Sequence, residues 1–408
     1  MRTPEIAVTG LGMITPGGVG AAETWEEVRA GRPTARRLPE LRGLPVDFGC
    51  PVDGGDLDAA VGGRKTWRMH RFVKLAVIAA RQAVADAGLD PAGWDGGRVG
   101  VVIGVGVGGV SVLTDNALRL SAEGPGAVSP LLVPMMIPNA AAGEVAIALS
   151  AHGPSLAPAT ACASGATAIA VARDLLASGQ CDVVVAGGAE SVLQPLVVSG
   201  FAQMGAVSRR CDDPAGASRP FAGDRDGFVI AEGAGMLVLE RAADAAARGG
   251  RARALLAGVG STTDAHHPTA PDPRGRCAQA AVEEALRDAG WSPYDVGHVN
   301  AHGTSTPLND AMEADVIARV FPHWPPVTSA KGVLGHSLAA AGAIEAALTV
   351  LTLEEGVIPP IANLDAPAVE FDLNCVTKQA RRESVERAVS HSFGFGGHNV
   401  VLAFQRGA

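Results

Sequence analysis

A short pattern occurs twice in this sequence, at a separation close to half the length of the 408-residue chain. Residues 83–91 read AVADAGLDP, and residues 285–293 read ALRDAGWSP. In each copy an alanine-rich helix would end at the glycine, and a proline follows shortly after it. A candidate strand comes next in both places, at residues 98–106 and at residues 298–302. Duplication of a strand–helix unit is the simplest explanation, and it predicts two similar halves.

Short apolar runs that resemble buried strands recur along the whole chain. Several of them, such as VGVVIG and CDVVVAGG, are followed by glycine and then by a helical pattern. Near-continuous apolar strands that alternate with helices indicate sheets covered on both faces. We therefore predict a layered α/β protein with halves at residues 1–250 and 251–408. No linker-like segment separates the two, so we expect them to share a large interface.

Composition and charge exclude several classes of protein. The longest apolar runs fall short of the ~18 residues that a membrane-spanning helix needs. The N-terminal sequence MRTPEIAVTG lacks the apolar core of a signal peptide. Six widely spaced cysteines without a CxxC pair argue against a metal site or disulfides and for a reducing cytoplasm. The net charge of −9 argues against nucleic acid as a partner.

One basic segment interrupts this acidic chain. It reads RKTWRMHRFVK, at residues 64–74. Two interpretations stay open, a solvated helix face and a docking patch for an acidic partner. Lysine is otherwise rare in the chain, which makes Lys331 conspicuous.

Cys162 lies in the stretch ATACASGATAIA, among very small side chains. The residues before it can be extended and those after it are helical, so it falls near the start of a helix. Unpaired N–H groups and the helix dipole favour a thiolate there, and the same N–H groups can hold an oxyanion. A buried structural cysteine is the alternative, but it would not require such small neighbours.

Two histidines and the rare lysine lie in similar surroundings in the second half. His302 belongs to VNAHGTSTPLND, at the end of an expected strand, and Lys331 and His336 belong to SAKGVLGHSLAAAGAIEA, before an expected helix. Ligands of open α/β sheets bind beyond the strand ends. We therefore predict that the cysteine, the histidines and the lysine form one site. A nucleotide site at GVGVGG, residues 104–109, is weakly supported because the spacing departs from GxGxxG.

With these motifs in family order, the sequence resembles the β-ketoacyl-acyl carrier protein synthases of the thiolase superfamily. It is most similar to the elongating KAS II-like enzymes and to the ketosynthase subunits of type II polyketide systems. The resemblance spans nearly the whole chain and implies a thiolase-like fold, with duplicated βαβαβαββ halves layered α-β-α-β-α. Its motifs are GLGMITPGG, TACASG, SRPFAGDRDGFVIAEGAG, NAHGTSTP, SAKGVLGH and SFGFGGHN.

The resemblance implies a decarboxylating condensation. Cys162 would take an acyl chain from the phosphopantetheine of an acyl carrier protein, and His302 and His336 would assist the loss of carbon dioxide from a malonyl unit. Lys331 would order the site together with Glu313 or Asp310, and would disfavour protonation of His336 by like charge. The N–H groups of Cys162 and Phe395 would form the oxyanion hole.

Further residues take their roles from the same resemblance. Phe395 would act as a gate beside Phe393, because the glycines of SFGFGG permit motion. Thr304, Thr306 and Thr269 would hydrogen-bond the pantetheine arm. The remaining assignments are an acyl pocket at Val107, Leu132 and Phe201, and carrier-protein docking at Lys65, Arg68, Arg71 and Lys74. Arg209 and Arg210 would join the docking face, since Gly205 stands where some relatives carry an arginine.

The resemblance also implies a partner set and leaves alternatives. We expect no bound cofactor or metal, acyl carrier protein as partner, and a dimer through a continuous sheet, either a homodimer or a heterodimer with a chain-length factor. A chain-length factor itself would lack the nucleophile, and a thiolase would carry a second cysteine that SFGFGGHN does not contain. Fatty-acid and polyketide pathways both stay open.

Overall fold

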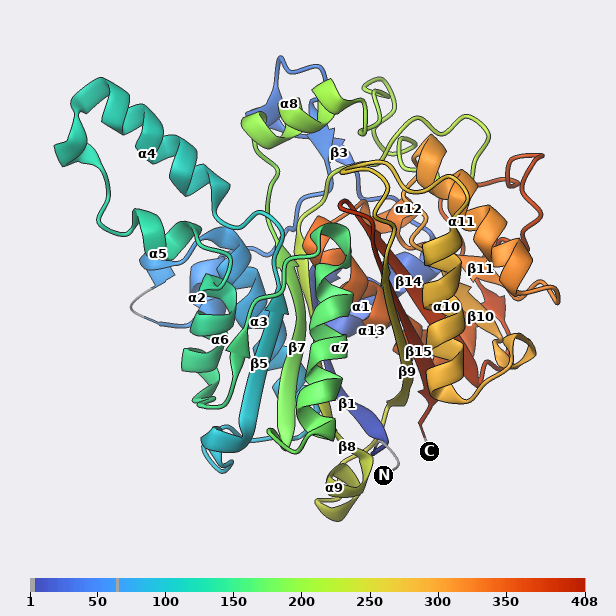
Figure 1. The fold of residues 1–408 in the computed structure, drawn as a ribbon. Helices are drawn as coiled ribbons and strands as arrows, with labels where there is room; N and C mark the ends of the chain where they lie inside the picture. The colour runs from blue at the N-terminus through green and yellow to red at the C-terminus, as the bar shows by residue number, and fades with distance from the viewer. Residues whose placement is uncertain (1–3, 64–65, 408) are drawn as a thin grey trace.

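The computed structural model describes residues 4–63 and 66–407, and its main strands form one sheet built from two similar halves (Figure 1). The first half has the order β6–β5–β7–β8–β1, and the second has the order β11–β10–β14–β15–β9. Parallel and antiparallel pairs occur in the same sequence in both halves. The halves join where β1 pairs with β9. The strands are β1 (Ile6–Thr15), β5 (Val99–Gly104), β6 (Ser155–Leu156), β7 (Val183–Glu190), β8 (Gly233–Arg241), β9 (Ala254–Thr263), β10 (His298–Asn300), β11 (Val327–Thr328), β14 (Arg387–Gly394) and β15 (His398–Arg406).

Helices cover both faces of each half. Helices α3 and α6 pack on the outer face of the first half, and α10 and α11 pack on the outer face of the second. Helices α7 and α13 lie between the halves and share a core with both (Figure 1). The α-β-α-β-α arrangement of a thiolase-like fold is therefore confirmed. The bounds are α3 (Arg71–Asp86), α6 (Ala140–Leu149), α7 (Ser164–Ala177), α10 (Arg276–Ala289), α11 (Pro307–Val320) and α13 (Ala341–Glu355).

The repeated sequence pattern corresponds to the C-terminal ends of α3 and α10. Each helix approaches a strand so closely that the strand needs glycine at the contact. A Cβ added to Gly10 of β1 would lie 2.1 Å from the carbonyl oxygen of Ala83, and one added to Gly258 of β9 would lie 2.2 Å from that of Ala285. The duplication is thus visible as the same close helix–strand contact in both halves.

The two central helices also meet through small residues. A Cβ on Gly165 of α7 would lie 2.9 Å from the carbonyl oxygen of Ala339, and one on Gly342 of α13 would lie 3.0 Å from Cβ of Ala166. This close crossing brings together the N-terminal ends of α7 and α13. Since Cys162 precedes the first and His336 precedes the second, the crossing places both residues at the same end of the central layer.

The remaining elements lie around this frame. Helices α4 and α5 form an arm that projects from the first half (Figure 1). Among the described residues, none of the helices has the length and apolar character needed to cross a membrane. The peripheral elements are α1 (Ala21–Ala30), α2 (Leu57–Val61), α4 (Val110–Glu123), α5 (Leu132–Met136), α8 (Pro195–Met204), α9 (Ala242–Ala247), α12 (Lys331–Leu334), β2 (Gly18–Val19), β3 (Arg36–Arg37), β4 (Phe48–Gly49), β12 (Val357–Ile358) and β13 (Arg381–Arg382).

The division into residues 1–250 and 251–408 stays our proposal. Its boundary falls in the turn between α9 and β9, after the last strand of the first half. The symmetric strand orders support it, because each half contains one full copy of the strand pattern.

Candidate active site

Cys162 sits in a tight turn that enters helix α7. It is the middle residue of a short 3-10 helix, Ala161–Ala163, and Ala161 before it has a left-handed φ of 49°. Such a conformation costs a non-glycine residue on the order of 1 kcal/mol, so surrounding packing must enforce it. Gly394 at the end of β14 supplies that packing, since a Cβ there would lie 2.5 Å from the carbonyl oxygen of Thr160. The second half of the fold thus presses directly on the turn that presents the thiol.

The two predicted histidines lie beside each other in the cavity that contains Cys162. Their ring centroids are 5.3 Å apart, with the ring planes nearly perpendicular at 83°. His302 follows β10 and His336 follows α12, and both side chains are buried. Cys162 and both histidines line one cavity of about 430 Å³. The predicted grouping of these three residues in one cavity therefore agrees with the geometry.

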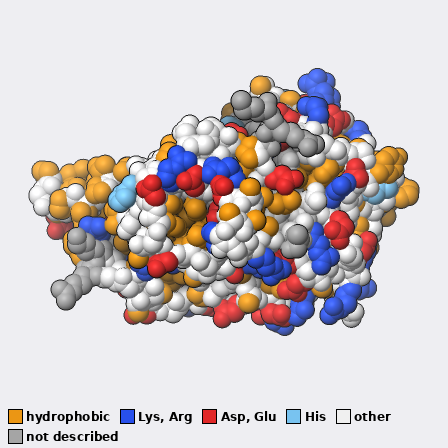
Figure 2. Space-filling view, turned by 90° about the horizontal axis from the view of Figure 1, so that it is seen from below, with side chains coloured by type: hydrophobic (Ala, Val, Ile, Leu, Met, Phe, Trp, Pro, Cys, Tyr) orange, Lys and Arg blue, Asp and Glu red, His pale blue; other side chains and the backbone are white. Residues whose placement is uncertain are grey.

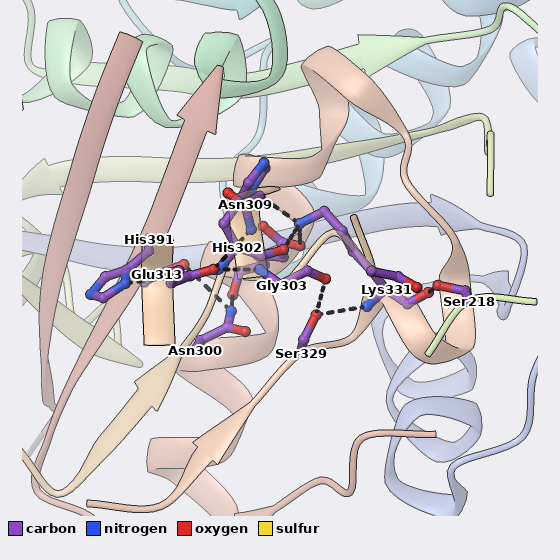
Figure 3. A network of polar contacts seen from close by, with 12 residues as sticks. Ser218, Asn300, His302, Gly303, Asn309, Glu313, Ser329, Lys331 and His391 are labelled. Carbon is purple, nitrogen blue, oxygen red and sulfur yellow. Dashed lines mark hydrogen bonds and ion pairs between the residues drawn. The ribbon is translucent and has the colours of Figure 1, made fainter. Parts of the chain in front are cut away.

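Lys331 is buried and its side chain extends toward His302 (Figure 3). Its ammonium group donates to the carbonyl oxygen of His302 at 2.6 Å, lies 3.2 Å from Nδ1 of His302, and forms an ion pair with Glu345. Glu313 and Asp310 were expected to order the site together with Lys331, but among the described residues the lysine's ion pair is with Glu345. Glu345 lies on α13 and is buried like Lys331.

Glu313 and Asp310 brace the backbone instead. Glu313 accepts from the N–H groups of His302 and Gly303, both at 2.7 Å, and Nδ1 of His391 lies 3.1 Å from it (Figure 3). Asp310 accepts from the N–H of Ser305 in this loop at 3.2 Å and from that of Phe221 at 2.8 Å. These carboxylates on α11 hold the loop after β10 by its main chain, so they fix the position of the His302 ring without touching it.

Both histidines are held neutral. Burial lowers the pKa of His302 and of His336 well below the usual value, and the positive charge of Lys331 lowers both further. The predicted like-charge effect on His336 is confirmed. Because the lysine ammonium can only donate, Nδ1 of His302 accepts and its proton resides on Nε2. In that tautomer Nε2 of His302, on the side of the ring away from Lys331, is an N–H donor rather than a basic lone pair.

The thiol of Cys162 differs from the prediction of a resting thiolate. Burial raises its pKa to about 12, and the charge of Lys331 together with a hydrogen bond from the Phe395 backbone only partly opposes this. The sequence revealed the helix start but not the burial, and desolvation of a charged sulfur outweighs the local dipole. The resting residue is therefore a thiol that must lose its proton as it reacts.

Most of the other predicted site residues line the same cavity. Phe201 and Phe395 approach with ring centroids 6.5 Å apart, and the ring of Phe393 lies 5.9 Å from that of His302. The predicted pantetheine and acyl-pocket residues among its lining are Thr269, Thr304, Thr306, Val107 and Phe201. Leu132 is absent from the lining, since it belongs to α5 on the projecting arm. Its assignment to the acyl pocket therefore stays a prediction.

The predicted docking patch is not supported by the described residues. Arg71 makes two hydrogen bonds to Glu232, at 2.7 and 2.8 Å, and Lys74 pairs with Asp58 at 2.5 Å. Arg68 lies 3.4 Å from Glu144. These cations are matched by carboxylates from distant parts of the chain, which leaves little positive charge for an acidic partner. Lys65 and its neighbour Arg64 lie outside the described residues.

The sequence analysis missed two buried carboxylates of the site, Glu345 and Glu190. Burial raises the pKa of both to about 7, opposed by Lys331 at Glu345 and by backbone N–H groups at Glu190. Each carried a signal in the sequence. Glu345 is the one charged residue in the apolar stretch SLAAAGAIEAALTVLTL, and Glu190 ends the apolar strand VVVAGGAE. An isolated charge in an apolar element is rarely buried without a partner.

The fold and the cysteine–histidine cavity define a thiolase-like acyltransferase. Residues 3–245 match the family described as "Beta-ketoacyl synthase, N-terminal domain", and residues 253–365 match its C-terminal domain. A protein of Synechocystis named 3-oxoacyl-[acyl-carrier-protein] synthase 2 is 42% identical over 100% of this chain and 99% of its own length. A Vibrio cholerae protein of the same name is 38% identical over 100% of both.

Solved structures agree with these relatives. A β-ketoacyl synthase from Burkholderia phymatum superposes with a TM-score of 0.93 at 33% identity, over 99% of each chain. A type II polyketide ketosynthase solved in complex with its acyl carrier protein gives a TM-score of 0.92 at 30% identity, over 99% of this chain and 100% of that one. This chain belongs to the β-ketoacyl synthase family.

Proposed function

We propose that the protein extends an acyl chain by two carbons through decarboxylative condensation, with Cys162 as the nucleophile and a malonyl thioester of acyl carrier protein as the donor. One observation carries this proposal. A cysteine at a helix start and two neutral imidazoles line a single cavity, beside a phenylalanine-containing loop. The named function of the full-length relatives supports the choice of substrate carrier.

In the first step the acyl group moves to the enzyme. The sulfur of Cys162 attacks the carbonyl carbon of an acyl-pantetheine thioester, and its proton passes to the departing pantetheine sulfur. The developing oxyanion is held by the N–H groups of Cys162 and Phe395, and the second of these already points at the sulfur. Because burial holds the thiol neutral, removal of its proton must accompany the attack.

In the second step a malonyl thioester enters the same cavity. His302 and His336 donate hydrogen bonds to its thioester oxygen, so that electrons from the breaking bond to carbon dioxide are held as an enolate. The enolate carbon then attacks the acyl carbonyl on Cys162, and the sulfur leaves and regains a proton. Each positioned donor is typically worth about 3 kcal/mol of transition-state stabilisation. Neutral imidazoles suit this role because each already carries the donated proton.

The cavity lining supports the remaining assignments. We assign Thr304, Thr306 and Thr269 to the pantetheine arm, and Val107 and Phe201 to the acyl chain.

Phe395, with Phe393 beside it, is the proposed gate. It is followed by Gly396 and Gly397, whose φ angles are 85° and 76°. These left-handed angles permit a backbone swing that other residues would resist.

The carrier protein would dock at the mouth of the cavity. Met204 and Leu308 line the cavity and are 51% and 62% exposed, so they form an apolar rim. Arg209 is exposed nearby and can meet acidic groups of the partner, whereas Arg210 is paired with Asp224. This rim replaces residues 64–74 as the proposed docking face.

A second copy of this chain is the proposed dimer partner. The short strand β6 is the outer edge of the first half, and its Leu156 is 42% exposed. Apolar side chains gather on the projecting arm, at the left end of the view in Figure 2, and Leu118 of α4 is 71% exposed.

Sedimentation equilibrium tests the dimer. We expect the purified chain alone to sediment at twice its monomer mass, and Leu118→Asp to weaken association because it buries a charge in an apolar contact. A monomer at micromolar concentration, converted to a heterodimer only by a chain-length factor, would contradict the proposal.

Intact-mass spectrometry tests the function. The protein is mixed with an acyl thioester of acyl carrier protein, and we expect its mass to rise by one acyl group. Addition of malonyl-acyl carrier protein should then return the enzyme to its free mass and produce the β-ketoacyl thioester, with release of carbon dioxide. Acylation without condensation would support the thiolase alternative, and no acylation would support the chain-length factor.

A further inference from the structure

One buried carboxylate in the cavity wall has no part in the chemistry proposed above. Glu190 is the last residue of β7, and its side chain is fully buried. Its Oε2 accepts from the N–H groups of Gly106 at 2.9 Å and Val107 at 3.0 Å, and its Oε1 accepts from that of Gly108 at 3.3 Å. Three consecutive amides therefore converge on one side chain, which fixes the loop that follows β5.

The other side of this loop is fixed by the arm. The N–H of Gly109 donates to the carbonyl oxygen of Met136 at 3.1 Å. Gly108 has a φ of 76°, and a Cβ there would lie 2.7 Å from the same oxygen. On the Glu190 side, a Cβ on Gly106 would lie 2.7 Å from Oε2. The loop thus lies between the Glu190 carboxylate and the end of α5, and a Cβ at Gly106 or at Gly108 would clash with the adjoining oxygen atom.

These contacts determine the position of Val107. Its side chain lines the cavity, and its neighbours on both sides are glycines. Val107 is 41% exposed, so side-chain packing holds it only in part, and the hydrogen bond from its backbone N–H to Glu190 fixes the position of its main chain. Displacement of this loop by a fraction of an ångström would change the length of the pocket available beyond Cys162.

We propose that Glu190 is a positioning residue that sets the acyl chain length the enzyme accepts, by holding the Gly106–Gly108 loop and thereby the Val107 wall. The inference rests on the proposed function, because it assumes that the acyl chain on Cys162 extends past Val107. A carboxylate is suited to this task. Its two oxygens offer acceptor sites to all three amides, whereas an amide side chain would turn an N–H group toward at least one of them.

The test compares chain-length profiles of the wild type and Glu190→Gln. The rate of Cys162 acylation is measured by intact mass for a series of acyl carrier protein thioesters, from butyryl to palmitoyl. We expect the preferred length to change, with the ratio of kcat/KM for long against short acyl groups altered about tenfold, the discrimination that one methylene gives in an apolar pocket. A residue with a purely structural role would lower all rates together and leave the ratio unchanged.

Glu240→Gln is the matched control. Glu240 is equally buried, on β8, but accepts from Thr9 and Arg248 and does not line the cavity. Its loss should lower stability without changing the length profile. A change in the profile of this control equal to that of Glu190→Gln would overturn the proposal, since any buried carboxylate would then have the same effect.

Gly106→Ala supplies an independent variant should Glu190→Gln fail to fold. Its methyl group would push the loop away from an intact Glu190, and we expect a changed length profile again. If those variants that fold are acylated at normal rates with an unaltered chain-length profile, the positioning role is refuted. If the wild type itself is not acylated on Cys162, the proposed function fails instead, so the two failures are distinguishable.

Discussion

Cys162→Ala is expected to abolish acylation and to lower the rate of condensation by about four orders of magnitude or more, the usual consequence of removing a covalent nucleophile. The substitution removes the only cysteine among the residues that line the cavity in the described structure. The mass increase on incubation with acyl-acyl carrier protein should disappear completely. The fold should survive, because alanine fits among the small residues of this turn.

Cys375→Ala is the control that separates nucleophilicity from burial. Burial raises the pKa of Cys375 to about 12, as it does at Cys162, but Cys375 does not line the cavity. If the environment of the cavity activates the thiol during the reaction, only Cys162→Ala loses the acyl adduct. Persistence of the adduct in Cys162→Ala, or its loss in Cys375→Ala, would place the nucleophile elsewhere.

The fold was predictable because its duplication left a local signature. The C-terminal ends of α3 and α10 pack closely against their strands, and this contact requires the same small residues in both halves. The repeat at residues 83–91 and 285–293 is therefore recognisable in the sequence. Cys162, His302 and His336 were likewise found from their positions at helix starts and strand ends. These features depend on local backbone geometry, which can be predicted from the residues that are adjacent in the sequence.

The misplaced assignments depend on contacts between distant parts of the chain. Arg71 was expected to be a free surface cation, but the fold places Glu232 within hydrogen-bond distance of it. The residues near Lys331 in the sequence likewise did not reveal its ion pair with Glu345 on α13. Leu132, which was assigned to the acyl pocket by likeness to relatives, lies on the projecting arm, and the sequence near it does not encode the direction of that arm. The state of the Cys162 thiol was misjudged for the same reason, because burial is a property of the whole fold.

Lys331→Met is expected to have the second largest effect, and it should act on stability and on catalysis separately. Removing one member of a buried ion pair leaves the carboxylate of Glu345 without its partner, which typically costs about 3–5 kcal/mol of unfolding free energy. Urea unfolding measures this cost. Condensation should fall by two orders of magnitude or more, about the contribution of one positioned acid–base group, because His302 loses the donor that fixes its tautomer.

The destabilisation should depend on pH in a defined direction. Burial already raises the folded-state pKa of Glu345 to about 7 from an unfolded value near 4.5, and loss of Lys331 raises it further. A carboxyl whose pKa is raised by folding loses stability as the pH increases above its unfolded pKa. The difference in unfolding free energy between wild type and Lys331→Met should therefore be larger at pH 8 than at pH 6. An equal difference at both values would show that Glu345 is not the group left behind.

The double variant Lys331→Met/Glu345→Gln separates the two roles. Replacing both members of the pair leaves neither position charged, so most of the lost stability should return, in keeping with other buried ion pairs replaced by neutral groups. Condensation should remain low, because His302 still lacks the ammonium group at Nδ1, and without that positive charge the pKa of both histidines moves back toward its usual range. The rate should then fall more steeply below neutral pH than in the wild type, as the imidazoles become protonated. Recovery of the wild-type rate together with stability would show that Lys331 serves the fold alone.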